Sequence, residues 1–262
     1  MKPEGPSVEL PKVQTIIRNT NRMRQKKRPK HPSDLKFEWV EDALPNDFVQ
    51  ADITVGPAWH IILYTPLLLA LLSRAKTWYL DGTFKAVCKP FSQLWGIHAF
   101  ITQGESVKQV PLVFVVMSRR TKNDYIHILN TLKNVLPAKI ELTAVMMDFE
   151  SAVWGSISFI FPRVERFGCV FHWTQAVWRK IQELNLEPTY RKKRDTGRFL
   201  RQLLCLPFLP AEHISTIFQG LLDLVQPHHP KPLHDLMQYV DDQWLKSTVW
   251  PPSQCSVFEK VI

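Results

Sequence analysis

Two apolar runs that each end in a single aspartate constrain this 262-residue chain more than any other feature. The first covers residues 78–80 and ends in Asp81, and the second covers residues 142–147 and ends in Asp148. A buried strand that ends in an aspartate leaves a carboxylate at the edge of the sheet, where its charge can meet water, a metal ion or a substrate. A single such aspartate is more often a turn residue. The pair, together with the elements between them, favours a functional site.

The segments between the two aspartates predict a mixed α/β fold. Residues 94–102 and 110–117 are expected to form strands joined by a glycine-bearing turn, which makes a three-stranded meander with the first run. A helix over 124–136 then returns across the sheet, so the strand that ends in Asp148 should lie parallel to the first. Further elements are expected at 151–161 (helix), 167–171 (strand) and 173–184 (helix). This order is typical of a ribonuclease H-like core, in which the first and fourth strands are neighbours and Asp81 would lie close to Asp148.

The flanking segments divide the chain into three predicted parts. Residues 1–40 form a basic flexible arm, residues 41–187 form the ribonuclease H-like core with its mixed sheet flanked by helices, and residues 188–262 form a C-terminal all-helical insertion region. Within the core, residues 34–57 are a lead-in without strong periodicity. Thr65 is expected to cap a helix that starts at Pro66, with Leu67, Leu68, Leu71 and Leu72 on its buried side. In the last part, helices are predicted at 199–206, 214–225 and 234–246, after a basic cluster at 191–194.

The positive charge is concentrated near the N-terminus. The chain has a formal net charge of +9, and residues 1–40 carry ten Lys and Arg against four Asp and Glu. A basic arm ahead of a nearly balanced body indicates a polyanionic partner. The run from 16 to 30 has no acid, so Arg24, Lys26, Lys27 and Arg28 are candidates for DNA phosphate contacts or for a nuclear import signal. A solvated tail without such a role stays open as the alternative.

Composition excludes several other classes of protein. With 45% hydrophobic residues the chain can bury a large core and is not intrinsically disordered. Its four cysteines show no paired spacing, which favours a reduced, intracellular protein. The most apolar stretch, residues 61–72, is shorter than the ~20 residues that cross a bilayer. It is interrupted by Pro66 and is expected to be a core helix, so no membrane partner is predicted.

Four motifs carry a resemblance to a known family. They are Ala75-Lys76-Thr77-Trp78-Tyr79-Leu80-Asp81-Gly82-Thr83-Phe84, Met147-Asp148-Phe149-Glu150, Cys169-Val170-Phe171-His172-Trp173 and Leu206-Pro207-Phe208-Leu209-Pro210. Together they resemble the transposase domain of Mutator-like elements, a branch of the DDE transposases, over residues 63–250. The first and third motifs are the most specific.

The resemblance implies a metal-dependent site that acts on DNA. It implies that Asp81 and Asp148 are the first two catalytic acids and hold divalent metal, Mg²⁺ or Mn²⁺, because carboxylates suit hard cations. It places His172 beside the active site, where it could contact DNA phosphate, and Cys169 more plausibly in the core, because two ligands do not make a zinc site. DNA as the partner, a nuclear location and an oligomer of the chain on DNA are further expectations.

One motif of the family is not found in this sequence. The third acid of the family is a glutamate on a late helix, in an Arg-Thr-Asn-Asn-like segment that follows the helical insertion, and the sequence as given resembles a truncated end. Candidate replacements are Glu150, Asp241, Asp242 and Glu259. The favoured hypothesis is therefore a transposase-derived DNA-binding protein without strand transfer. The alternatives are an active transposase with an unidentified third carboxylate and a ribonuclease H-like nuclease.

The basic arm gives a testable prediction. Deleting residues 1–36 should flatten the slope of log affinity against log salt for DNA, because each Lys or Arg that neutralises a phosphate adds to that slope. Fluorescence anisotropy over a salt series measures it, with DNAs of unrelated sequence expected to give equal affinities. An unchanged slope would indicate that DNA binds to residues 191–194 and the face of the sheet rather than to the arm.

Overall fold

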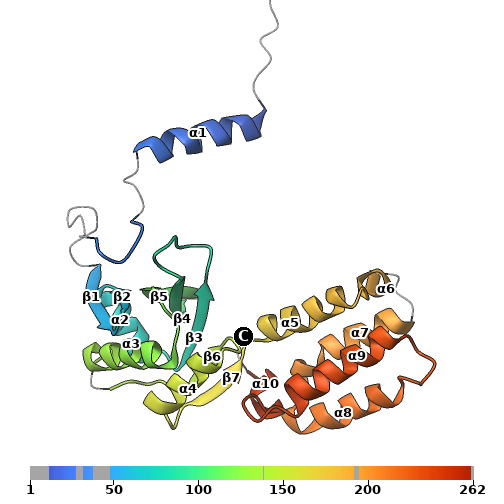
Figure 1. Cartoon of the computed structure of the whole chain (residues 1–262). Coiled ribbons are helices and arrows are strands. Elements are labelled where there is room, and N and C mark those ends of the chain that lie inside the picture. Colours follow the sequence, from blue (N-terminus) through green and yellow to red (C-terminus); the bar gives the residue numbers. More distant parts are fainter. Residues whose placement is uncertain (1–11, 28–31, 38–47, 138, 192–194, 261–262) are drawn as a thin grey trace, which may run out of the picture.

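A seven-stranded mixed sheet with the order β1-β2-β5-β4-β3-β6-β7 forms the body of the molecule. The computed structural model describes residues 12–27, 32–37, 48–137, 139–191 and 195–260 (Figure 1). The strands are β1 (Val49–Val55), β2 (Ala58–Leu63), β3 (Thr77–Thr83), β4 (Gln93–Gln103), β5 (Ser106–Met117), β6 (Ala144–Met147) and β7 (Glu165–Gly168). β3 pairs antiparallel with β4 and parallel with β6, and β6 pairs parallel with β7. The α/β architecture, with its mixed sheet flanked by helices, confirms the predicted fold class and is compatible with a ribonuclease H-like core.

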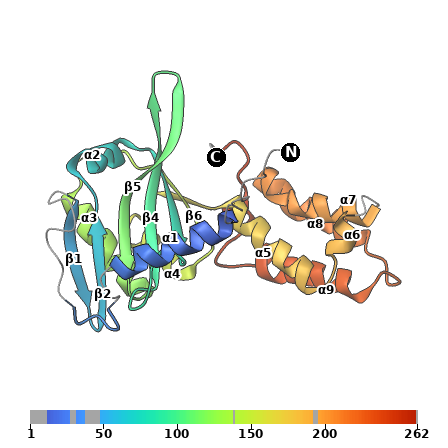
Figure 2. The same cartoon turned by 90° about the horizontal axis from the view of Figure 1, so that it is seen from above.

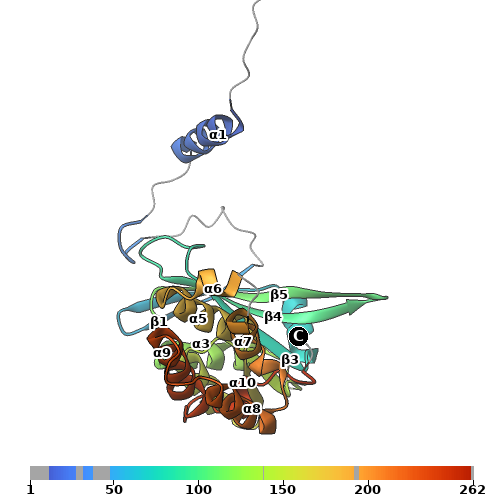
Figure 3. The same cartoon turned by 90° about the vertical axis from the view of Figure 1, so that its right-hand side faces the viewer.

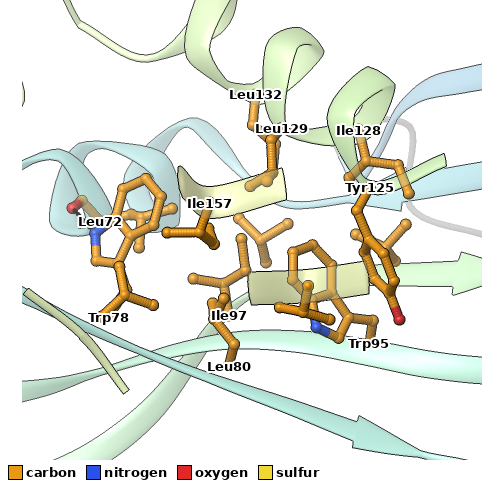
Figure 4. Close-up of a cluster of buried hydrophobic side chains, with 14 of the residues drawn as sticks. Leu72, Trp78, Leu80, Trp95, Ile97, Tyr125, Ile128, Leu129, Leu132 and Ile157 are labelled. Carbon is orange, nitrogen blue, oxygen red and sulfur yellow. Dashed lines mark hydrogen bonds between the residues drawn. The ribbon is translucent and has the colours of Figure 1, made fainter. Parts of the chain in front are cut away.

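Three helices cover one face of this sheet: α2 (Pro66–Arg74), α3 (Lys122–Val135) and α4 (Ser151–Ile160). Figure 4 shows their side chains meeting those of β3 and β4, with Trp78, Trp95 and Tyr125 among the labelled residues. Trp78 is fully buried, and its indole N–H donates to the carbonyl of Leu72 at 3.1 Å. A large aromatic side chain stabilises a core most when its polar atom also finds a partner. This packing fixes which face of β3 is turned away from solvent.

The C-terminal helices build a second core beside the sheet (Figures 2 and 3). They are α5 (Val170–Glu183), α6 (Glu187–Arg191), α7 (Asp195–Leu204), α8 (Ala211–Asp223) and α9 (Lys231–Val240), with short turns η2 (Leu206–Phe208), η3 (Asp241–Leu245) and α10 (Pro252–Cys255). Phe149 and Trp250 pack against both cores. Val257, which follows α10, is buried with Tyr79 and Met146 on the face of the sheet opposite α3 and α4. No helix in the described part of the chain is long and apolar enough to cross a membrane.

Most of the predicted elements occur where the sequence placed them. The meander, the returning helix and the parallel strand before Asp148 correspond to β3–β5, α3 and β6. Thr65 caps α2 as predicted, because its hydroxyl accepts the backbone N–H of Leu68 at 3.3 Å. The buried side of that helix differs from the predicted one, because Leu69 and Leu72 are buried whereas Leu67 is 69% exposed. The helix docks through the residues that point at β4 and β5, and the leucine pattern alone did not identify them.

Several other predictions need correction. The lead-in at 34–57 contains β1, which forms an antiparallel hairpin with β2, so residues 61–63 belong to a strand and only the later part of 61–72 is helical. β7 ends at Gly168 rather than at Phe171, because its partner β6 has only four residues. α5, assigned to the sheet domain by the predicted boundary at 187, buries its apolar side in the helical core.

Part of the predicted basic arm forms a helix. Residues Val13–Lys27 form helix α1, all of whose residues are exposed and which lies apart from the sheet (Figure 1). The segment contains no proline or glycine, so nothing in it interrupts a helix.

An ion pair around the buried Asp124 ties the β1–β2 hairpin to the start of α3. The Asp124 carboxylate is fully buried and accepts hydrogen bonds from Arg119 at 2.8 and 2.9 Å and from the backbone N–H and hydroxyl of Thr121 at 2.8 and 2.7 Å. His60 Nε2 on β2 lies 3.3 Å away, and Arg119 also donates to the carbonyl of Val55. Burial alone would raise the pKa of Asp124, but these donors outweigh it and hold the pKa well below its usual value of 3.8.

Removing this charge should destabilise the fold. Asp124→Asn leaves Arg119 and its neighbours without their anionic partner, and we expect a loss of about 3–5 kcal/mol in the free energy of unfolding at pH 7. Because the native pKa is depressed, the contribution of Asp124 is present above pH 3.8 and is lost as the pH falls below that value. Urea denaturation at several pH values measures both effects, and the gap between variant and wild type should narrow in acid.

The matched control for this prediction is Glu187→Gln. Glu187 pairs with Arg191 at 2.6 Å on the surface of α6, where solvent screens the interaction, so no measurable change is expected. Equal effects of the two substitutions would show that burial does not decide the strength of the Asp124 cluster.

Candidate functional site

The parallel pairing of β3 and β6 brings the two predicted aspartates together. Leu80 on β3 is in register with Met147 on β6, so the next residues, Asp81 and Asp148, lie side by side. Alternation along the strands turns Leu80 toward the core under α3 and α4 and turns both aspartates to the opposite face of the sheet. The predicted position of the two carboxylates at neighbouring parallel strands is therefore confirmed.

His172 is the third member of this group. It lies in the first turn of α5, because the chain enters that helix at Cys169, directly after Gly168 has paired with Met147. Its Nδ1 atom lies 2.8 Å from Asp148 Oδ1, and its Nε2 atom lies 3.9 Å from Asp81 Oδ1. One potential ligand atom from each of the three residues lies within 4.8 Å of the other two. We refer to Asp81, Asp148 and His172 as the triad.

The two carboxylates favour a positive charge in the triad, and the proton of His172 and a divalent cation would compete to supply it. The contact with Asp148, followed by the proximity of Cys169, raises the pKa of His172 to about 10, although burial opposes this shift. Asp148 Oδ1 and His172 Nδ1 are both buried and lie 2.8 Å apart, so each is the other's polar contact. Two carboxylate oxygens and one imidazole nitrogen are ligands that divalent cations accept. Once His172 has lost its proton, the donor set fits the divalent metal that the sequence predicted, and His172 could serve as a third ligand.

Exposure differs among the three side chains in a way that suits a substrate site. The Asp81 side chain is 51% exposed, whereas those of Asp148 and His172 are 24% and 28% exposed. Thr83 donates its hydroxyl to the other oxygen of Asp81 at 3.4 Å. The inner two residues are thus held by the fold, and the outer carboxylate faces solvent.

The four candidates for a third catalytic carboxylate have other contacts in the structure. Glu150 accepts a hydrogen bond from Tyr125 at 3.4 Å and lies 4.0 Å from Arg120, and burial raises its pKa. Asp241 pairs with Lys246, Asp242 accepts from Gln238 at 2.7 Å, and Glu259 is exposed. Among the described residues, none of these four belongs to the triad's ligand group.

The predicted DNA-contacting residues are separated from the triad along the chain. Arg24, Lys26 and Lys27 lie in the last turn of α1, fully on its exposed surface, and Arg28 lies outside the described residues. Of the basic cluster at 191–194, only Arg191 is described, and it is paired with Glu187. His172 is the one predicted DNA-contacting residue that the fold places in the triad itself.

Arg120 is a residue near the site that the sequence reasoning missed. Its guanidinium lies 4.6 Å from the centre of the Phe84 ring and 4.0 Å from Glu150, so it touches both segments that follow the two aspartates. Its side chain is 41% exposed and can reach an anion. The available signal was the Arg119-Arg120 pair just before the cap of α3, where β5 ends beside the start of β4.

Fold and site together define an α/β domain, compatible with a ribonuclease H-like fold, with a carboxylate pair on neighbouring parallel strands. Residues 77–176, which run from β3 into α5 and include the whole triad, match the family model of the MULE transposase domain. This match supports the resemblance that the sequence motifs had indicated. No curated protein matches the chain.

Metal binding by the triad can be measured directly. We expect wild type to bind Mn²⁺ weakly in isothermal titration calorimetry and expect Asp81→Asn or Asp148→Asn to remove the binding signal, because each substitution takes away a charged ligand. Glu150→Gln is the matched control, since Glu150 follows the same strand but is hydrogen-bonded by Tyr125. Loss of binding in Glu150→Gln with binding retained in Asp81→Asn would place the metal on the other side of β6.

Proposed function

We propose that this chain is a transposase-derived DNA-binding protein whose triad holds a divalent cation, Mg²⁺ or Mn²⁺, against a DNA phosphodiester, and that the chain as given does not join DNA strands. The observation that carries this proposal is the register of β3 and β6, which sets two carboxylates and an imidazole within 4.8 Å of one another. It rests on the transposase domain at residues 77–176 for the choice of DNA as substrate.

The residues of the triad have distinct roles in this proposal. Asp148 and His172, held between β6 and the start of α5, provide the fixed ligands, and Asp81 provides the solvent-facing ligand beside the substrate. Like charges at this distance repel unless a cation lies between them. A divalent cation there would polarise the phosphodiester toward attack by water or a 3′-hydroxyl.

DNA affinity is proposed to come from two basic elements. Helix α1 has no acid in its first turn and ends in Arg24, Lys26 and Lys27, which can neutralise phosphates without reading sequence. Arg120 is close to the segments that follow both aspartates, and its 41% exposed side chain could contact a phosphate of DNA that runs past the site. A nuclear location, with the basic run as an import signal, follows from this proposal.

The proposed lack of strand transfer is supported by the other contacts of the candidate carboxylates. Glu150 interacts with Tyr125 and Arg120, and Asp241 interacts with Lys246, so each already has a partner away from the triad. With two carboxylates, the charge that develops in the transition state is less well compensated. Missing one such group costs several kcal/mol of transition-state stabilisation, or roughly a thousandfold or more in rate.

The test is an assay of labelled element-end DNA with Mn²⁺. We expect Mn²⁺ to strengthen binding, expect Asp148→Asn to remove the Mn²⁺-dependent part only, and expect no cleavage or joining. Joining by wild type that Asp81→Ala abolishes would establish the active-transposase alternative. Hydrolysis of an RNA–DNA hybrid with the same dependence on Asp81 would establish the nuclease alternative. Absence of any effect of Mn²⁺ on DNA binding would contradict the proposed site.

A further inference from the structure

A cavity of about 310 Å³ opens beside the triad on the face of the sheet opposite α3 and α4. All three triad residues line it, and its other walls include Phe171, His98 and Gln109. Ligand sites typically have volumes of about 300–1,000 Å³ and combine apolar walls with a few polar groups. The cavity therefore has the size and the mixed lining of a binding site, and only its triad wall is used by the metal chemistry.

Phe171 supplies an aromatic surface at this cavity. The residue precedes His172 in the first turn of α5, and its side chain is 63% exposed. The centres of the Phe171 and His172 rings are 5.3 Å apart, with the ring planes at 83°. An aromatic side chain that is exposed next to a DNA site offers a stacking surface for a base, and such stacking is insensitive to sequence.

His98 and Gln109 supply polar groups from the sheet. His98 on β4 is opposite Tyr79 on β3, and Gln109 lies on β5, in the long β4–β5 hairpin that extends beyond the rest of the sheet (Figure 2). The His98 ring lies over Gly96, where an added Cβ atom would come within 2.5 Å of Nε2. A neutral imidazole and a primary amide can each donate and accept hydrogen bonds, as the edges of bases require.

A base can stack on Phe171 and also hydrogen-bond to His98 and Gln109 only when it is unpaired. In a duplex, each base has its faces stacked on neighbours and its pairing edge occupied, so the ring of Phe171 could not stack on it and only the groove edges would be open to His98 and Gln109. A base at a strand end or one turned out of the stack presents a free face and a free edge. We infer that the cavity beside the triad binds one unpaired base of a DNA strand, stacked on Phe171 and hydrogen-bonded by His98 and Gln109.

This inference rests on the proposed function, because the phosphate of the same nucleotide must then lie at the triad. It adds a substrate preference that the triad alone does not give: DNA with unpaired nucleotides near its end over blunt duplex. It also assigns a role to Phe171, which neither the fold nor the metal site requires. Base stacking on an aromatic side chain changes affinity by roughly fivefold to more than a hundredfold when that side chain is removed.

The experiment compares two DNAs of equal duplex length, one blunt and one with a short 3′ overhang that carries the fluorescent base 2-aminopurine. With wild type and Mn²⁺, we expect tighter binding of the overhang DNA and quenching of the 2-aminopurine. Phe171→Ala should weaken overhang binding by about tenfold or more and abolish the quenching, with blunt-duplex binding unchanged. Phe171→Trp should retain both, because an indole stacks at least as well.

Phe159→Ala is the matched control, since Phe159 is 65% exposed on α4 and does not line the cavity. Equal weakening of blunt and overhang DNA by Phe171→Ala, or no effect on either, would overturn the inference. Mn²⁺ calorimetry on Phe171→Ala shows whether the metal site is intact in that variant, which separates failure of the base-binding inference from failure of the proposed function. If wild type binds Mn²⁺ and DNA but does not quench the 2-aminopurine, only the inference fails. If wild type binds neither, the proposed function fails with it.

Discussion

The register between β3 and β6 is the constraint on which the site depends. Trp78 and Leu80 from one strand and Val145 and Met147 from the other are buried on the same face, under α3 and α4. Because side chains alternate along a strand, a one-residue shift of either strand would move the two buried side chains of that strand to the wrong face. The same shift would carry one aspartate away from the other. The hydrophobic core thus determines the separation of the carboxylates, and the polar site needs no interaction of its own to bring them together.

The residue after Asp148 anchors this site to the helical region. The Phe149 ring packs edge-on against Trp244 and Trp250 at 4.7 and 5.6 Å between centres and stacks near Trp154. Gly168 on the neighbouring strand makes room for it, because a Cβ atom there would lie 2.1 Å from the ring. The site therefore lies where the two cores meet. Substitutions at this aromatic contact are expected to act on the position of Asp148 rather than on its chemistry.

The charges that face DNA are distributed over separate elements. α1 carries basic side chains on a helix with no buried residue, whereas Arg120 lies beside the sheet edge where β3 and β6 end. The first can add affinity over a broad stretch of phosphates, and the second can act only at the site. Such a division lets non-specific attraction and local positioning be changed independently.

The sequence by itself determined the elements and the two aspartates, because each depends on local signals: apolar runs that end in Asp, the Thr65 cap and the turn after β4. Those signals also carried the resemblance to the transposase domain that residues 77–176 match. Only the tertiary structure decided that His172 joins the two carboxylates, because its position depends on where β7 stops pairing with β6. It also decided the β1–β2 hairpin, the place of Arg120 and the cavity at Phe171, since each arises from contacts between segments far apart in the chain. Local patterns record what a segment can form, whereas the partners of its side chains are fixed only when the sheet and helices pack.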